Sequence, residues 1–236
     1  MSLALKLALA PVLVAQAVAA RRRAPVLPEA GGPREGLVGA RAPRWSLLIA
    51  GDSSAAGVGV AHQDQAFAGC LLRGLERNGQ ALRWQLRARS GLTTRQLHDG
   101  LRAEPPGPAD LAVIVTGVND VIDQVSAARA VVQRAALADW LLAHGTRHVA
   151  FTPLPPMHHF PLLPQPLRRV MGADAAAHNA AIARWAATRS DVSLVPIVMD
   201  LGPDVMAADG FHPGEPVYRA CGEATAEHLI QLMKET

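Results

Sequence analysis

Short apolar runs alternate with longer amphipathic segments along the last four fifths of the chain. Five of the short runs predict β-strands, at residues 45–50, 83–88, 111–116, 148–152 and 192–198. Five longer segments fit helices, at residues 65–78, 93–101, 126–144, 170–189 and 215–234. The first and third strands are apolar almost throughout, as strands covered on both faces are. The pattern therefore predicts an α/β domain with a five-stranded, mostly parallel sheet between helical layers.

Residues 1–23 have a different pattern, an apolar run interrupted by Lys6, Pro11 and Gln16 and followed at once by three arginines. Positive charge after the run favours a membrane anchor or an interfacial helix that keeps the rest of the chain on the cytoplasmic face. The small residues at 17–19 are typical of a cleaved export signal, which makes an exported or periplasmic protein the second interpretation. A helix packed on the protein's own surface is the third.

Residues 24–44 are rich in proline, glycine and charge, and they predict a linker. Residues 45–236 are then expected to form one domain, long enough to bury a core. The net charge is only +3 despite a pI near 9.4, and the arginines are spread along the chain. This distribution argues against a nucleic-acid partner. The oligomeric state stays open.

The chain has two cysteines, Cys70 and Cys221, and neither lies in a metal-binding spacing. Two cysteines do not make a disulfide framework, so free thiols are expected, although pairing between them stays open. Residues 51–59 contain neither a dinucleotide-binding glycine pattern nor a Walker lysine. We therefore expect no cofactor and no metal.

Glycines and polar residues follow three of the predicted strands. These blocks are Gly51-Asp52-Ser53, Ser90-Gly91 and Gly117-Val118-Asn119-Asp120, and a fourth block, Asp209-Gly210-Phe211-His212-Pro213, precedes the last helix. Ligands of open parallel sheets bind at the carboxyl ends of the strands, so these blocks are expected to surround one site. Each block alone also fits a plain turn or a helix N-cap.

Together the blocks resemble the SGNH (GDSL-like) hydrolases, whose marker residues match Ser53, Gly91, Asn119 and His212. The resemblance extends from Trp45 to the C-terminus. It implies a flavodoxin-like, three-layer α/β/α fold and the hydrolysis of ester bonds. It also implies an oxyanion hole made by the backbone N–H groups of Ser53 and Gly91 and the side-chain amide of Asn119.

A serine hydroxyl becomes a good nucleophile when a base takes its proton and a third group orients that base. Ser53 fits the nucleophile, His212 the base and Asp209 the orienting acid, because one short loop can present the last two together. Asp204 and Asp200 also lie nearby, and a backbone carbonyl is a further alternative. Two other acids, Asp52 and Asp120, are interpreted as supports for the loops or as helix N-caps.

The predicted reaction is hydrolysis of a small-molecule carboxylic ester through an acyl-enzyme. Residues 152–167 follow the fourth strand and are rich in proline and apolar side chains, which favours an apolar acyl group. Transfer or removal of an acyl group on a carbohydrate or lipid-linked acceptor uses the same residues and is the first alternative. The second, from another class, is an inactive ligand-binding domain. A classical α/β-hydrolase is disfavoured, because Ser53 lacks the Gly-x-Ser-x-Gly elbow.

Overall fold

A six-stranded sheet forms the centre of the structure, a computed structural model that describes residues 3–198 and 201–235. The strands are β1 (Glu35–Val38), β2 (Trp45–Gly51), β3 (Leu82–Ala88), β4 (Leu111–Val115), β5 (His148–Phe151) and β6 (Val192–Leu194), in the spatial order β1-β3-β2-β4-β5-β6. All neighbours run parallel except β1, which pairs antiparallel with β3. Without β1, the strand order is that of the flavodoxin-like fold. In this order β3 lies on one side of β2, and β4, β5 and β6 follow on the other side.

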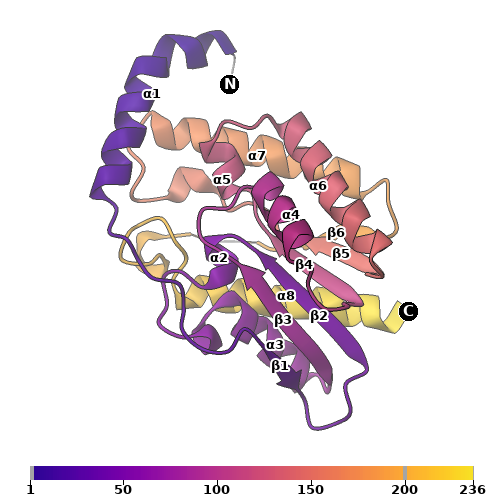
Figure 1. The fold of residues 1–236 in the computed structure, drawn as a ribbon. Coiled ribbons are helices and arrows are strands. Elements are labelled where there is room, and N and C mark those ends of the chain that lie inside the picture. Colours follow the sequence, from indigo (N-terminus) through magenta and orange to yellow (C-terminus); the bar gives the residue numbers. More distant parts are fainter. Residues whose placement is uncertain (1–2, 199–200, 236) are drawn as a thin grey trace.

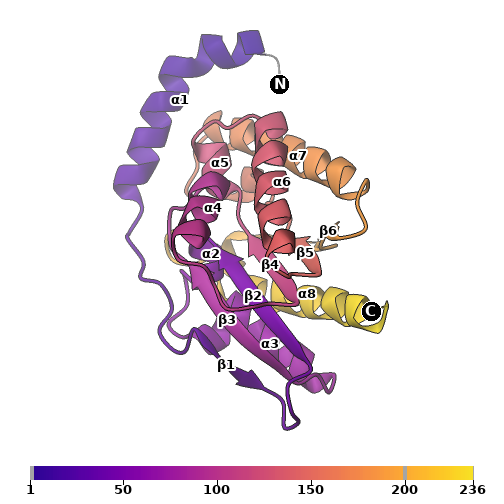
Figure 2. The ribbon, with the colours of Figure 1, turned by 45° about the vertical axis from the view of Figure 1, so that its right-hand side comes forward.

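Helices cover both faces of this sheet (Figures 1 and 2). The longer ones are α3 (Phe67–Arg77), α4 (Thr94–Ala103), α6 (Ala127–Ala143), α7 (Leu167–Ala186) and α8 (Glu215–Glu235). Alternate side chains of β2 separate the two cores: Leu47 and Ile49 pack against α3 and α8, whereas Leu48 and Ala50 pack towards α4, α6 and α7. The three-layer α/β/α architecture expected from the sequence is therefore confirmed.

The sheet has one strand more than predicted, because β1 forms within residues 24–44, the segment expected to be a linker. Strand β1 lies at the edge of the sheet, and three of its four residues are exposed. An exposed edge strand buries no apolar face and thus leaves no hydrophobic alternation in the sequence. The last strand, β6, is shorter than expected and ends at Leu194.

Helix α1 (Leu3–Arg23) lies against the outside of the domain through its C-terminal half. The Gln16 side chain bonds to the loop before α7, donating to the Gln165 carbonyl at 2.6 Å and accepting the Leu167 N–H at 3.1 Å. Leu13 and Ala20 join an apolar cluster that includes Leu167. The beginning of α1 extends past the neighbouring elements in both views (Figures 1 and 2).

The outward side of α1 is apolar. Val12, Val14 and Val18 are 46%, 62% and 46% exposed, and the three arginines at residues 21–23 end the helix in solvent. No helix within residues 3–198 or 201–235 combines the length and the apolar character needed to cross a membrane.

Candidate active site

Ser53 is the first residue of the short helix α2 (Ser53–Ala56), directly after β2. Asp52 caps this helix, with its carboxylate accepting the Ser54 N–H at 3.0 Å. Gly51 is required before it, because a Cβ at this position would overlap the carbonyl of Val115 on the adjacent strand β4. The close approach of β2 and β4 therefore fixes the half-buried serine at the carboxyl edge of the sheet.

Asp209 and His212 share one turn that brings both side chains to Ser53. One oxygen of Asp209 accepts the backbone N–H groups of Phe211 and His212, each at 2.9 Å. Its other oxygen lies 2.5 Å from His212 Nδ1, and His212 Nε2 lies 3.0 Å from Ser53 Oγ. Gly210 makes the turn possible, because its φ of +64° lies in the left-handed region.

The charge of Asp209 is maintained although the side chain is buried. Burial acts to raise the pKa of this carboxyl, but hydrogen bonds from the His212 side chain and from the backbone outweigh it and hold the pKa below its usual value. Asp204, the other described carboxylate that the sequence placed near the histidine, is exposed to solvent. Asp200 lies outside the described residues. The geometry thus assigns the place beside the imidazole to Asp209.

The Asn119 amide connects the loops that carry Ser53 and Gly91. Its Nδ2 donates to the carbonyl of Leu92 at 3.0 Å and lies 3.5 Å from the carboxylate of Asp52. Gly91 is exposed, has a φ of +82°, and faces open space where a side chain would be. The structure therefore brings the four blocks of the sequence to one edge of the sheet.

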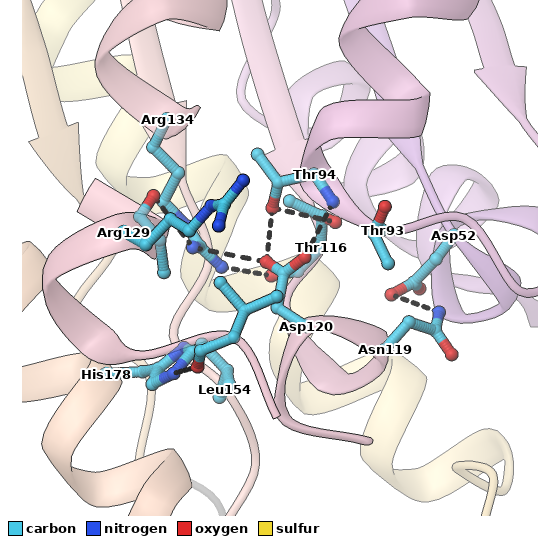
Figure 3. Close-up of polar contacts among 12 residues, drawn as sticks. Asp52, Thr93, Thr94, Thr116, Asn119, Asp120, Arg129, Arg134, Leu154 and His178 are labelled. Carbon is cyan, nitrogen blue, oxygen red and sulfur yellow. Dashed lines mark hydrogen bonds and ion pairs between the residues drawn. The ribbon is translucent and has the colours of Figure 1, made fainter. Parts of the chain in front are cut away.

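Asp52 is fully buried beside Ser53. Burial raises the pKa of its carboxyl to about 7, although the Ser54 N–H and the nearby His212 act in the opposite direction. Figure 3 shows its side chain turned towards Asn119. Asp52 is therefore both a helix cap and a neighbour of Asn119.

Asp120 points away from Asn119 into a buried polar cluster (Figure 3). Its carboxylate accepts the backbone N–H and the hydroxyl of Thr94 and forms an ion pair with Arg134 at 3.4 Å. Neither Thr94 nor Arg134 was predicted from the sequence. Arg134 could have been noticed, because it occupies the apolar face of α6 together with Ala130 and Leu137.

Glu29 is a second contributor that the sequence did not indicate. Its carboxylate accepts the backbone N–H of Ser90 at 2.7 Å and the Ser90 hydroxyl at 2.9 Å, and it pairs with Arg34 at 2.6 Å. Arg34 in turn donates to the carbonyl of Ala88 at 2.7 Å. Residues 24–44 therefore brace the loop that carries Gly91.

An apolar pocket opens beside Ser53 and His212. It has a cavity volume of about 70 Å³ and extends between the ends of β4 and β5 and helices α3 and α8. Its walls are formed by apolar side chains, among them Phe67, Val115, Phe160, Leu201, Phe211 and Val217. Thr152, Pro153 and Pro155 also line it, so the segment after the fourth predicted strand does border the site.

The two cysteine thiols near this pocket are protonated at neutral pH. Cys70 and Cys221 are free thiols, and Cys221 lines the pocket. Burial, assisted by the Cys70 thiol, raises the pKa of Cys221 to about 12, so this wall stays neutral. Among the side chains of the described ranges, no group of three or more His, Cys, Asp or Glu residues is placed to hold a metal ion.

Comparisons with known proteins point to one family. The sequence model of the GDSL-like Lipase/Acylhydrolase family matches residues 49–220. TesA is 26% identical, with 79% of this chain and 99% of TesA covered at a TM-score of 0.61. A GDSL-like lipase from Bacteroides thetaiotaomicron is 19% identical, with 79% and 88% covered at a TM-score of 0.59.

The psychrotrophic esterase EstA from Pseudoalteromonas is 16% identical, with 80% of this chain and 98% of EstA covered at a TM-score of 0.61. At the low identities of EstA and the Bacteroides protein, the likeness concerns the fold alone. No curated protein sequence matches the chain significantly.

Proposed function

Because this chain belongs to the GDSL-like lipase/acylhydrolase family and is thus an esterase/lipase-type hydrolase, we propose that it cleaves carboxylic esters through an acyl-enzyme on Ser53. The observation that carries the proposal is the continuous pair of contacts from Asp209 through His212 to Ser53, at 2.5 and 3.0 Å. A nucleophile, a base and an orienting acid in this arrangement are what acyl transfer by serine requires.

The roles follow from the direction of the hydrogen bonds. Asp209 accepts the proton on Nδ1 of His212, which leaves the lone pair of Nε2 facing the hydroxyl of Ser53. His212 takes the hydroxyl proton as Ser53 Oγ bonds to the ester carbonyl carbon, and it passes that proton to the departing alcohol. Water then attacks the acyl-enzyme with His212 again as the base, and the acid product leaves as Ser53 regains its proton.

The negative charge on the carbonyl oxygen needs preorganised donors. We assign these to the backbone N–H groups of Ser53 and Gly91 and to Nδ2 of Asn119. The contact of Asn119 with Asp52 is long, at 3.5 Å, so this hydrogen is available to an oxyanion while the bond to Leu92 holds the amide in place. The open space at Gly91 leaves room for the substrate.

The apolar pocket supports a short acyl chain as the preferred substrate. Its volume of about 70 Å³ is less than half of the roughly 150 Å³ in which an apolar cavity binds benzene, so it suits a chain on the order of three carbons. Phe211 lines this pocket, with its ring 5.1 Å from that of Phe160 and 5.3 Å from that of His212. A bulky or charged acyl group would therefore bind poorly.

A chain-length series of p-nitrophenyl esters, from acetate to decanoate, tests this function. We expect kcat/KM to be highest for the short chains, Ser53→Ala to be folded and inactive, and Ser54→Ala to remain active. A fluorophosphonate probe mapped by mass spectrometry should modify Ser53. Turnover retained by Ser53→Ala would refute the assignment, and a maximum at decanoate would refute the proposed pocket.

The same assay, extended by an alcohol acceptor and an O-acetylated sugar, tests the two alternatives to ester hydrolysis. If a short alcohol added to the reaction yields a new ester in preference to the free acid, the protein is an acyltransferase. If no ester and no O-acetylated sugar is turned over and the probe leaves Ser53 unmodified, the chain is a ligand-binding domain.

We also propose that α1 attaches the enzyme to a membrane surface. The apolar outward side with Val12, Val14 and Val18 suits burial at a lipid interface, and the exposed arginines at residues 21–23 suit anionic headgroups. The order of these features favours the cytoplasmic face, with export as the alternative.

A further inference from the structure

Arg134 is an arginine in an unusual place. Its side chain on α6 is only 1% exposed, and its partner Asp120 is 0% exposed. Charged side chains are rarely buried to this degree, and a buried ion pair is weak evidence for stability, because apolar residues of similar volume often replace one without loss. The pair therefore calls for an explanation in terms of geometry.

Asn119 and Asp120 lie in the one-turn helix α5 (Val118–Ile122), and the guanidinium group of Arg134 contacts the chain both before this turn and within it (Figure 3). Its Nη2 donates to the carbonyl of Thr116 at 3.1 Å, before the turn, and its Nη1 lies 3.4 Å from the Asp120 carboxylate, after Asn119. Gly117 lies directly against it, because a Cβ at Gly117 would overlap Nη2. The φ of +131° at Gly117 belongs to the same turn.

The cluster continues from Asp120 to the loop that carries Gly91. Asp120 accepts the Thr94 N–H at 2.9 Å and the Thr94 hydroxyl at 2.5 Å, and Thr94 is the first residue of α4. Asn119 itself donates to the carbonyl of Leu92, two residues before Thr94. Two adjacent residues of one turn therefore hold the Gly91 loop, and Arg134 holds that turn.

We propose that Arg134 is a positioning residue of the oxyanion hole, which sets the place of the Asn119 amide relative to Ser53 and the Gly91 loop. The inference rests on the proposed function, because the position of the Asn119 amide matters to the rate only if Asn119 is an oxyanion donor. Oxyanion donors are effective only when they are held at the developing charge, and a displacement of about 1 Å reduces rates by roughly 10²-fold. A loss of Arg134 therefore lowers kcat more than it changes KM.

Arg134→Met tests the proposal, because methionine fills much of the space with an unbranched chain and makes none of the hydrogen bonds. We expect kcat for a short ester to fall on the order of tenfold to hundredfold, with a much smaller change in KM. Rates are expressed per active site, counted as the fraction of protein that a fluorophosphonate labels at Ser53 on long exposure. Unfolded protein is then excluded from the comparison.

Arg189→Met is the matched control. Arg189 is also ion-paired, with Asp139 at 2.6 Å and Asp191 at 2.7 Å, but it lies outside the site and its removal leaves kcat per active site unchanged. Arg134→Lys keeps a positive charge beside Asp120 and gives a smaller loss in kcat than Arg134→Met. The lysine variant also serves as the test if the methionine variant does not fold.

A double-mutant cycle with Asn119→Ala separates positioning from general stability. Asn119→Ala alone should reduce kcat by about 10²- to 10³-fold, with a smaller change in KM. If Arg134 acts through Asn119, its substitution costs little in this background, so the two losses are strongly non-additive.

Additive losses, or wild-type kcat per active site in both Arg134 variants, would overturn the inference. Failure of the proposed function looks different, since the wild-type protein itself would then neither hydrolyse esters nor be labelled at Ser53.

Discussion

Replacing Asp209 by asparagine should abolish most of the activity while leaving the fold intact. The asparagine carbonyl can still accept the backbone N–H groups of Phe211 and His212, both 2.9 Å from the same carboxylate oxygen. Its amide group then takes the position of the second oxygen, 2.5 Å from His212 Nδ1. A donor now faces the ring nitrogen that was a donor.

The imidazole relieves this conflict by carrying its proton on Nε2 instead of Nδ1. The protonated Nε2 cannot accept the hydroxyl proton of Ser53. The base is lost although every atom keeps its place. An Asp→Asn change of this kind costs about 10⁴-fold in kcat, or roughly 5 kcal/mol of transition-state stabilisation. The thermal midpoint should change little, because two of the three hydrogen bonds of Asp209 persist.

Steady-state kinetics with a short p-nitrophenyl ester measure the effect. Asp204→Asn is the matched control, since Asp204 is an exposed carboxylate in the same segment and its loss should leave kcat unchanged. If Asp209→Asn kept kcat within about tenfold of the wild type, the orienting role would be wrong and the site would be a dyad of Ser53 and His212.

Asp52→Asn should raise the thermal midpoint relative to the wild type increasingly from pH 4 to pH 8. Because the pKa of Asp52 is raised from 3.8 to about 7, the contribution of this carboxyl to stability is fully present below pH 3.8 and is lost as pH rises through 7. An equal difference at pH 5 and pH 8 would contradict this assignment. Deleting residues 1–23 should remove binding to anionic vesicles and leave kcat for a short ester within about twofold, because every proposed catalytic residue lies downstream. An inactive or unfolded truncation would mean that the docking of Gln16 and Ala20 completes the core, and a natural protein lacking residues 1–19 would indicate a cleaved signal.

Much of this protein can be predicted from the sequence because the relevant information is local. The buried runs at residues 45–50 and 111–116 identify central strands, and the positions just after them must lie at the carboxyl edge of the sheet. The spacing of Asp209 and His212 places both in one turn. The residues just after parallel strands lie at this edge however the rest of the chain packs.

Only the tertiary structure reveals which residues hold these blocks in place relative to one another. Glu29 contacts Ser90, which lies 61 positions further along the chain. The edge strand β1 that follows Glu29 has no hydrophobic alternation, so the sequence predicts a linker there. The position of Arg134 on the apolar face of its helix can be noticed in the sequence, but only the packing of α6 on the sheet shows that its guanidinium group lies against Gly117. Periodicity determines which face of an element is buried, but the partner that a buried polar group meets depends on how distant elements pack, and no local pattern encodes that.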